Sequence, residues 1–144
     1  MTAFFDADAA HPQAMTVQRA GMSMTEAPPA VSNGPFHVQM LLSSHQDGDV
    51  TAMRAVMPPG VVTHWHSHPA GQLLFVLDGV GWAQREGGAP VELRPGDSVW
   101  FAPEERHWHG ADARSAFSYL SVQAVKNGTA VCWMEPVTNR GQAS

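Results

Sequence analysis

The sequence predicts an all-β domain, either a sandwich or a barrel, from two observations. Short runs with alternating apolar residues recur along the chain, at Val50–Met57, Gln72–Leu77 and Phe117–Val125. Turn-forming residues separate such runs at intervals of about ten residues, and no stretch has the period of a helix. A barrel of this kind has an interior or a mouth in which a small site can lie.

The first 35 residues differ in texture from the rest. They are rich in Ala, Pro, Met, Ser and Thr, with Pro28-Pro29 and a turn signal at Asn33-Gly34-Pro35. We expect residues 1–35 to form a mostly irregular arm with a short strand around Met15–Arg19. Residues 36–144 are expected to form the β-barrel domain.

Each apolar run is bounded by its own turn signals. Val50–Met57 lies between Gln46-Asp47-Gly48-Asp49 and Pro58-Pro59-Gly60. Gln72–Leu77 ends at Asp78-Gly79, and Phe117–Val125 ends at Lys126-Asn127-Gly128.

The composition of the chain indicates one globular domain and argues against some classes of function. The chain has 144 residues, 44% of them hydrophobic and 15% charged, which suits one globular domain. A net charge of −5 and the absence of a Lys/Arg cluster argue against nucleic-acid binding. Cys132 is the only cysteine, so no intrachain disulfide forms. We interpret Cys132 as a small buried hydrophobe, with a nucleophile as the alternative.

No targeting or membrane segment is recognisable. The N-terminal stretch has no basic n-region, and Asp6, Asp8 and His11 interrupt any apolar run. No apolar run approaches the roughly 20 residues of a membrane span. The expectation is a soluble, cytoplasmic protein.

The histidines form a cluster in the sequence. Five of the eight are His64, His66, His68, His107 and His109. Side chains on a strand alternate between faces, so His64, His66 and His68 would share one face of a strand. His107 and His109 would likewise share one face of a later strand. If both faces are interior, the imidazoles converge, and a divalent cation is the simplest group that would hold them together. The alternative is a solvated, His-rich loop at a sheet edge.

Two spacings resemble the motifs of the cupin family. The first cupin motif, G(X)5HXH(X)3-4E(X)6G, falls without a gap on Gly60, His66, His68, Gln72 and Gly79. In the second, G(X)5PXG(X)2H(X)3N, Gly96 is followed eleven positions later by His107, which selects His107 over His109 as the fourth ligand. The resemblance implies a single-domain cupin, a double-stranded β-helix or jelly-roll barrel. It also implies a metal site formed by His66, His68, Gln72 and His107.

The chain departs from the cupin motifs at four positions. Gln72 stands where the first motif has Glu. In the second motif the proline comes one place late, at Pro103, Glu104 replaces the glycine, and Ala111 replaces the final asparagine.

Glutamine at position 72 changes the charge expected at the metal. Three neutral histidines and a carboxylate leave a divalent site at net +1, whereas an amide leaves it at +2. This favours Lewis-acid chemistry, in which the ion polarises a bound hydroxyl or carbonyl, over redox chemistry. The alternative is that Gln72 is a hydrogen-bonding residue beside a three-histidine site.

Several segments, in the same order, are similar to the bacterial hydroxynitrile lyases, a narrower group of cupins. The segments are His66–Gln72, Gly81–Gly88, Arg94–Phe101, His107–Ala111 and Val131–Thr138. The resemblance implies manganese as the metal, with iron, zinc or nickel as alternatives. It implies the reversible cleavage of a cyanohydrin into an aldehyde or ketone and cyanide.

Three residues are candidates for catalytic roles. His109 faces the same side as His107 and would exchange the substrate proton, or else it orients His107. His64 is a base, an alternative ligand or a residue that fills the pocket. Gln123, on the late strand, is a buried amide that needs a partner.

Two other functions compete with the lyase. One is a non-haem dioxygenase that acts on a small oxygenated compound, against which Gln72 argues mildly. The other is a non-enzymatic cupin that binds a small molecule or metal. The expected partners are a small-molecule substrate and further copies of the chain, as a homodimer or homotetramer, without nucleic acid or membrane.

Overall fold

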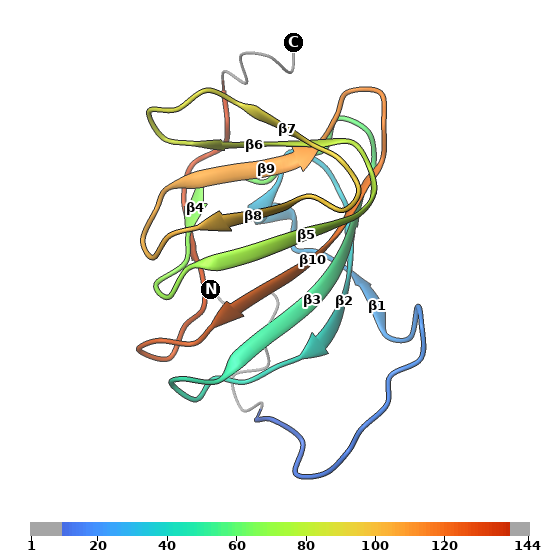
Figure 1. The fold of residues 1–144 in the computed structure, drawn as a ribbon, viewed down its shortest axis with the longest axis vertical. Coiled ribbons are helices and arrows are strands. Elements are labelled where there is room, and N and C mark those ends of the chain that lie inside the picture. The colour runs from blue at the N-terminus through green and yellow to red at the C-terminus, as the bar shows by residue number, and fades with distance from the viewer. Residues whose placement is uncertain (1–9, 139–144) are drawn as a thin grey trace.

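The computed structural model describes residues 10–138, and its regular structure is almost entirely β (Figure 1). The strands are β1 (Met24–Glu26), β2 (His37–Leu42), β3 (Val50–Met57), β4 (His66–Ser67), β5 (Gln72–Gly79), β6 (Gly81–Arg85), β7 (Val91–Leu93), β8 (Ser98–Phe101), β9 (His107–Ala111), β10 (Phe117–Ala124) and β11 (Cys132–Trp133). A single turn of 3-10 helix, η1, spans Pro29–Val31. The all-β class expected from the sequence is confirmed.

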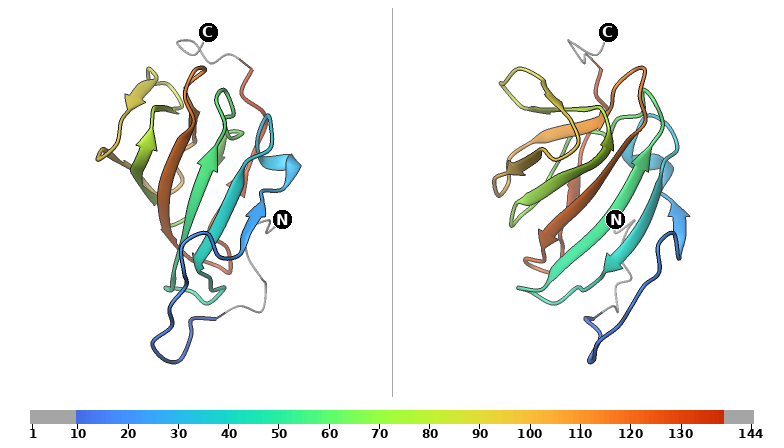
Figure 2. Two further views of the ribbon diagram at one scale, coloured as in Figure 1. Left: turned by 90° about the vertical axis from the view of Figure 1, so that its right-hand side faces the viewer. Right: turned by 45° about the vertical axis from the view of Figure 1, so that its right-hand side comes forward.

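The strands form two antiparallel sheets that face each other (Figure 2). One sheet has the order β1-β2-β3-β10-β5-β8, and the other has the order β11-β4-β9-β6-β7. From β3 onward the chain crosses repeatedly between the two sheets, apart from the β6–β7 hairpin, and the two inner faces enclose one interior, which is the jelly-roll arrangement.

Strand β10 lies at the centre of the larger sheet, between β3 and β5. Its residues alternate strictly, so that every second side chain from Phe117 to Gln123 is buried. Strand β3 shows the same alternation, with Thr51 and Met57 at its two buried ends.

The interior has an apolar end and a polar end. At one end of β10, Phe117 pairs with Gly79 and Met57, inside the apolar core. At the other end Gln123 pairs with Gln72 and Thr51, which are buried polar residues. The buried polar side chains therefore gather at one end of the barrel, where we look for a functional site.

Gly79 is required where the chain closes the apolar end. It has φ +78°, and a Cβ added there would lie 1.8 Å from the Ala116 carbonyl oxygen. Gly79, the last glycine of the first cupin motif, is therefore needed for two reasons: its backbone is in the left-handed region, and there is no space for a Cβ atom.

Two expectations about smaller features are wrong. Residues 15–19 form no strand, and Met15 and Val17 are 94% and 56% exposed; the strand of the arm is instead β1, which pairs with β2. Cys132 is exposed, since it alternates with Val131 and Trp133, which line the interior. The division into arm and barrel at residue 36 stays a prediction.

The outer face of the larger sheet carries exposed apolar side chains. They are Val50 and Val56 on β3, Leu73, Phe75 and Leu77 on β5, and Trp100 on β8. The expected homo-oligomer stays a prediction. Within residues 10–138, no helix is long and apolar enough to cross a membrane.

Candidate metal centre

Both sheets contribute to a cluster of polar side chains at the polar end of the barrel. His66 on β4 and His107 on β9 are directly opposite each other, with ring centroids 4.3 Å apart. The His68 ring lies 5.1 Å from that of His66 and 5.5 Å from that of His107. Gln72 begins β5, and its Oε1 lies 3.1 Å from His107 Nε2. The four residues expected to bind a metal thus come together.

Each of the three histidines is anchored through Nδ1 to a backbone carbonyl. The bonds run from His66 to His64 O (2.8 Å), from His68 to Ala130 O (2.7 Å) and from His107 to Glu105 O (2.8 Å). A carbonyl only accepts hydrogen bonds, so each Nδ1 carries the proton and each neutral Nε2 keeps a free lone pair. Orientation through the other ring nitrogen is the usual arrangement of histidines that bind metals.

A chain of buried hydrogen bonds fixes the orientation of the Gln72 amide. Gln123 Nε2 donates to Thr51 Oγ1 (2.6 Å) and to the Thr51 carbonyl (3.3 Å), so Gln123 Oε1 must face the other way. That oxygen accepts from Ser121 Oγ (2.6 Å) and from Gln72 Nε2 (3.3 Å). Gln72 therefore presents its amide nitrogen to the network and its oxygen toward the histidines.

Burial keeps the histidine cluster uncharged. It lowers the pKa of His68 to about 3 and that of His107 to about 4. Burial and then the neighbouring His107 hold the pKa of His66 and of His109 well below the usual value. No described residue that lines the cavity is acidic or basic apart from histidine. The imidazoles are therefore unprotonated at one ring nitrogen, which is the state that can bind a metal cation.

These residues fit a divalent cation. His68 Nε2 is buried and has no hydrogen-bond partner among residues 10–138, although such an atom normally has one. An ion beside it would supply that partner, and the lone pairs of His66, His107 and Gln72 Oε1 face the same region.

His109 also lies close to this group. One nitrogen each of His66, His107 and His109 lies within 4.8 Å of the other two, so a three-histidine set that includes His109 is a second arrangement that could hold a metal. His109 Nδ1 is buried without a hydrogen-bond partner in the described part of the chain. The assignment of ligands stays a prediction.

His64 lies apart from these side chains. Its backbone carbonyl accepts the hydrogen bond from His66, while its own side chain is half-buried and does not line the cavity. The chain is not in a strand at position 64, so the alternation expected from the sequence does not extend to it.

The cavity beside the cluster is narrow and mostly apolar, with a volume of about 20 Å³, room for about one water molecule. Its walls include Phe36, Met53, Tyr119, Val131 and Trp133. Among the described residues that line it, Val131 and Trp133 alone are partly exposed, so they form its mouth.

Sequence reasoning did not find Tyr119, Ser121 or Trp133. The alternation that placed Gln123 inside the barrel also places Tyr119 and Ser121 there, so a signal was present. For Trp133, whose ring lies 4.5 Å from that of His66, nothing in the sequence pattern indicated a contact with the histidine cluster.

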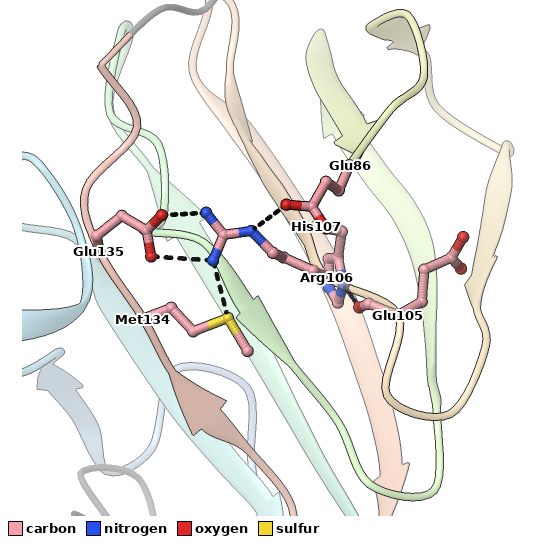
Figure 3. A network of polar contacts seen from close by, with 6 residues as sticks. All are labelled: Glu86, Glu105, Arg106, His107, Met134 and Glu135. Carbon is pink, nitrogen blue, oxygen red and sulfur yellow. Dashed lines mark hydrogen bonds and ion pairs between the residues drawn. The ribbon is translucent and has the colours of Figure 1, made fainter.

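The segment that carries Trp133 is held beside β4 and β9 by the network in Figure 3. Arg106, next to His107, forms a two-pronged ion pair with Glu135 and a second pair with Glu86 at 3.0 Å. Its guanidinium also lies 4.7 Å from the centre of the Trp65 ring, next to His66. The network thus joins the residues next to His66 and His107 to the segment at the mouth of the cavity.

Comparison with known proteins identifies relatives along most of the chain. Residues 53–123 match the Cupin domain family. A protein named (R)-mandelonitrile lyase from Granulicella tundricola is 43% identical over 126 residues, which cover 87% of this chain and 96% of that protein.

Two solved structures have a similar fold. A cupin-like protein from Thermotoga maritima is 29% identical, with a TM-score of 0.77 and coverage of 83% of this chain and 92% of that one. The DMSP lyase DddQ from Ruegeria pomeroyi is 26% identical, with a TM-score of 0.60; the match covers 72% of this chain and 54% of the lyase.

Proposed function

The chain belongs to the cupin family, and from this we propose that it is a metal-dependent lyase that reversibly cleaves a cyanohydrin into a carbonyl compound and cyanide. The observation that carries the proposal is the convergence of three Nδ1-anchored imidazoles with the oriented oxygen of Gln72. The relative named (R)-mandelonitrile lyase supports the reaction type.

We propose His66, His68, Gln72 and His107 as the ligands. A divalent ion held there, manganese in the first instance, would act as a Lewis acid and lower the pKa of a bound hydroxyl. Because all four donors are neutral, the site keeps the full charge of the ion. Gln123, a catalytic candidate from the sequence analysis, would act by fixing the orientation of the Gln72 amide.

His109 is proposed as the group that takes the proton from the substrate hydroxyl. It lines the cavity, and its Nδ1 has no hydrogen-bond partner in residues 10–138. Burial lowers the pKa of the imidazole, so the ring is neutral but weakly basic, and proton transfer to it would depend on the ion lowering the pKa of the bound hydroxyl. The O–H proton would move to His109 while the C–C electron pair leaves with cyanide, and the proton would then pass to cyanide. His109 is preferred to His64, whose side chain lies outside the cavity lining.

The cavity dimensions bear on the substrate. An aryl group needs far more than 20 Å³, since a cavity that binds benzene measures about 150 Å³. An aryl cyanohydrin would therefore require the side chains at the mouth, Val131 and Trp133, to move.

The test uses manganese-loaded protein and both enantiomers of mandelonitrile. We expect benzaldehyde release well above the rate in buffer, and a loss of at least about tenfold in His66→Ala, which removes a ligand. The matched control is His37→Ala, a histidine on the surface, which should retain the wild-type rate.

Metal content is measured in the same samples. If fully loaded wild-type protein releases benzaldehyde no faster than buffer, the lyase proposal is wrong. Oxygen uptake with iron-loaded protein and enediols or catechols would instead support the dioxygenase.

A further inference from the structure

An ion at the proposed metal site would leave two buried polar atoms of the cavity lining without a hydrogen-bond partner among the described residues. Three buried atoms in the lining have no hydrogen-bond partner among the described residues: His68 Nε2, His109 Nδ1 and the Tyr119 hydroxyl. An ion at the proposed site accounts for His68 Nε2. Leaving a buried polar group unpaired is costly, so the other two indicate a second ligand.

Tyr119 lines the cavity, and the packing around its ring holds it rigidly. The residue is fully buried on β10, between Ala55 of β3 and Val76 of β5. Its ring stacks on Phe117 at 5.2 Å and meets the edge of His109 at 5.0 Å. A ring fixed on two sides cannot turn its hydroxyl elsewhere at low cost.

The hydroxyl is suited to donate a hydrogen bond. Burial raises the pKa of the Tyr119 phenol above its usual value, so it keeps its proton at any working pH. No cationic side chain lines the described cavity. Tyr119 thus offers a neutral hydrogen-bond donor to an acceptor on a bound molecule.

We propose that the Tyr119 hydroxyl forms a second subsite, which donates a hydrogen bond to the nitrile nitrogen of the substrate. The inference rests on the proposed function. A cyanohydrin has two polar groups: its hydroxyl goes to the metal site and His109, which leaves the nitrile. The nitrile is slim and accepts hydrogen bonds without donating any, as a donor subsite in a narrow cavity requires. Negative charge grows on this group as cyanide departs, so the hydrogen bond strengthens during the reaction.

The experiment compares two probes of the same shape on manganese-loaded protein. Methoxyacetonitrile keeps the O–C–C≡N geometry of a cyanohydrin but cannot be cleaved, and methyl propargyl ether replaces the nitrile nitrogen by C–H. Binding is followed by tryptophan fluorescence, since Trp133 lines the cavity. We expect the nitrile to bind about two- to tenfold more tightly than the alkyne in wild type, and Tyr119→Phe to bring the ratio close to one.

Thermal unfolding of the ligand-free proteins provides an independent readout. Removing a hydroxyl that has no partner should leave the melting temperature of Tyr119→Phe unchanged or raise it. A clearly lower melting temperature would mean that the hydroxyl has a structural partner, and the subsite would be wrong.

The outcomes separate the subsite from the reaction. Nitrile preference that disappears in Tyr119→Phe, without cleavage of any cyanohydrin, would support the subsite and overturn the proposed reaction. Cleavage of mandelonitrile with no nitrile preference in wild type would overturn the subsite and leave the reaction standing.

Discussion

At the scale of single residues, the structure explains why position 72 is an amide. The Thr51 carbonyl can only accept a hydrogen bond, so Gln123 must turn its amide nitrogen toward Thr51. Its amide oxygen then faces Gln72 and Ser121. A glutamate at position 72 would place a second acceptor 3.3 Å from that oxygen. If Ser121 turned to the carboxylate, Gln123 would lose its donor instead. The buried network therefore favours a neutral amide at position 72.

The first prediction concerns Gln72→Glu. In metal-free protein, the buried carboxylate should lower the free energy of unfolding by about 1–3 kcal/mol, since one acceptor is left unpaired. Manganese should restore more stability to this variant than to wild type, because a carboxylate that faces the site attracts the ion. Denaturant unfolding with and without metal measures both effects.

Gln123→Glu is the matched control. It makes the same amide-to-acid change within the network, but its nitrogen donates to Thr51 and its oxygen accepts from Ser121 and Gln72, so the side chain is already engaged within the network. It should be destabilised without any additional gain from manganese. Equal gains in Gln72→Glu and wild type would show that side chain 72 does not face the ion.

At the scale of elements, the turn before β9 explains how the chain departs from the second cupin motif. Glu105 N donates to Ala102 O at 3.0 Å, which closes a four-residue turn with Pro103 second and Glu104 third. Glu104 has φ +65°, in the left-handed region that favours glycine. Proline second and a positive φ third is the pattern of a type II turn. The late proline and the missing glycine are thus two parts of one turn.

The second prediction is that Glu104→Gly stabilises the protein. The left-handed backbone costs a non-glycine residue about 1–2 kcal/mol, and glycine loses about 0.4–1 kcal/mol through the greater freedom of the unfolded chain. The free energy of unfolding should rise by roughly 0.5–1 kcal/mol in denaturant unfolding. Glu104→Ala keeps the strained backbone and is the control, with no gain expected. A stability that falls in Glu104→Gly would contradict the strain.

At the scale of the whole molecule, the histidine cluster links folding to pH. Burial lowers the pKa of four histidines in the folded chain, while each has a pKa near 6.5 when unfolded. Between these values the unfolded state binds more protons than the folded state. The stability of the metal-free protein is therefore complete above about pH 6.5 and declines as the pH falls below it.

The third prediction is a steep acid limb in the stability of metal-free protein. From pH 6 to pH 5, the free energy of unfolding should fall by about 1.4 kcal/mol for each buried histidine that stays neutral in the fold. His109→Phe removes one such group and should reduce the slope by about one proton. Denaturant unfolding across this range, in the presence of a chelator, measures the slope. A slope equal to that of wild type would show that His109 does not stay neutral in the fold.

Much of the fold could be predicted from local patterns. The runs at Val50–Met57, Gln72–Leu77 and Phe117–Val125 correspond to β3, β5 and β10, because an alternating pattern buries one face of a strand wherever that strand lies. Short elements were predicted less well. A strand was expected to carry His64, His66 and His68, but β4 has only two residues, and β11, also of two residues, is too short to show a period. The arm strand was misplaced because β1 exists only by pairing with β2.

The sequence by itself determined the strands, the cupin spacing and the set of side chains offered to a metal, since these depend on order along one chain. Only the tertiary structure decided which atoms of those side chains remain free. The Ala130 carbonyl holds His68 across 62 positions, and Thr51 orients Gln72 through Gln123 on a third strand. Tyr119 became a candidate only when its hydroxyl was found without a partner. Hydrogen bonds between distant strands have no local pattern, so the free donors and acceptors of the site appear only once the sheets are packed.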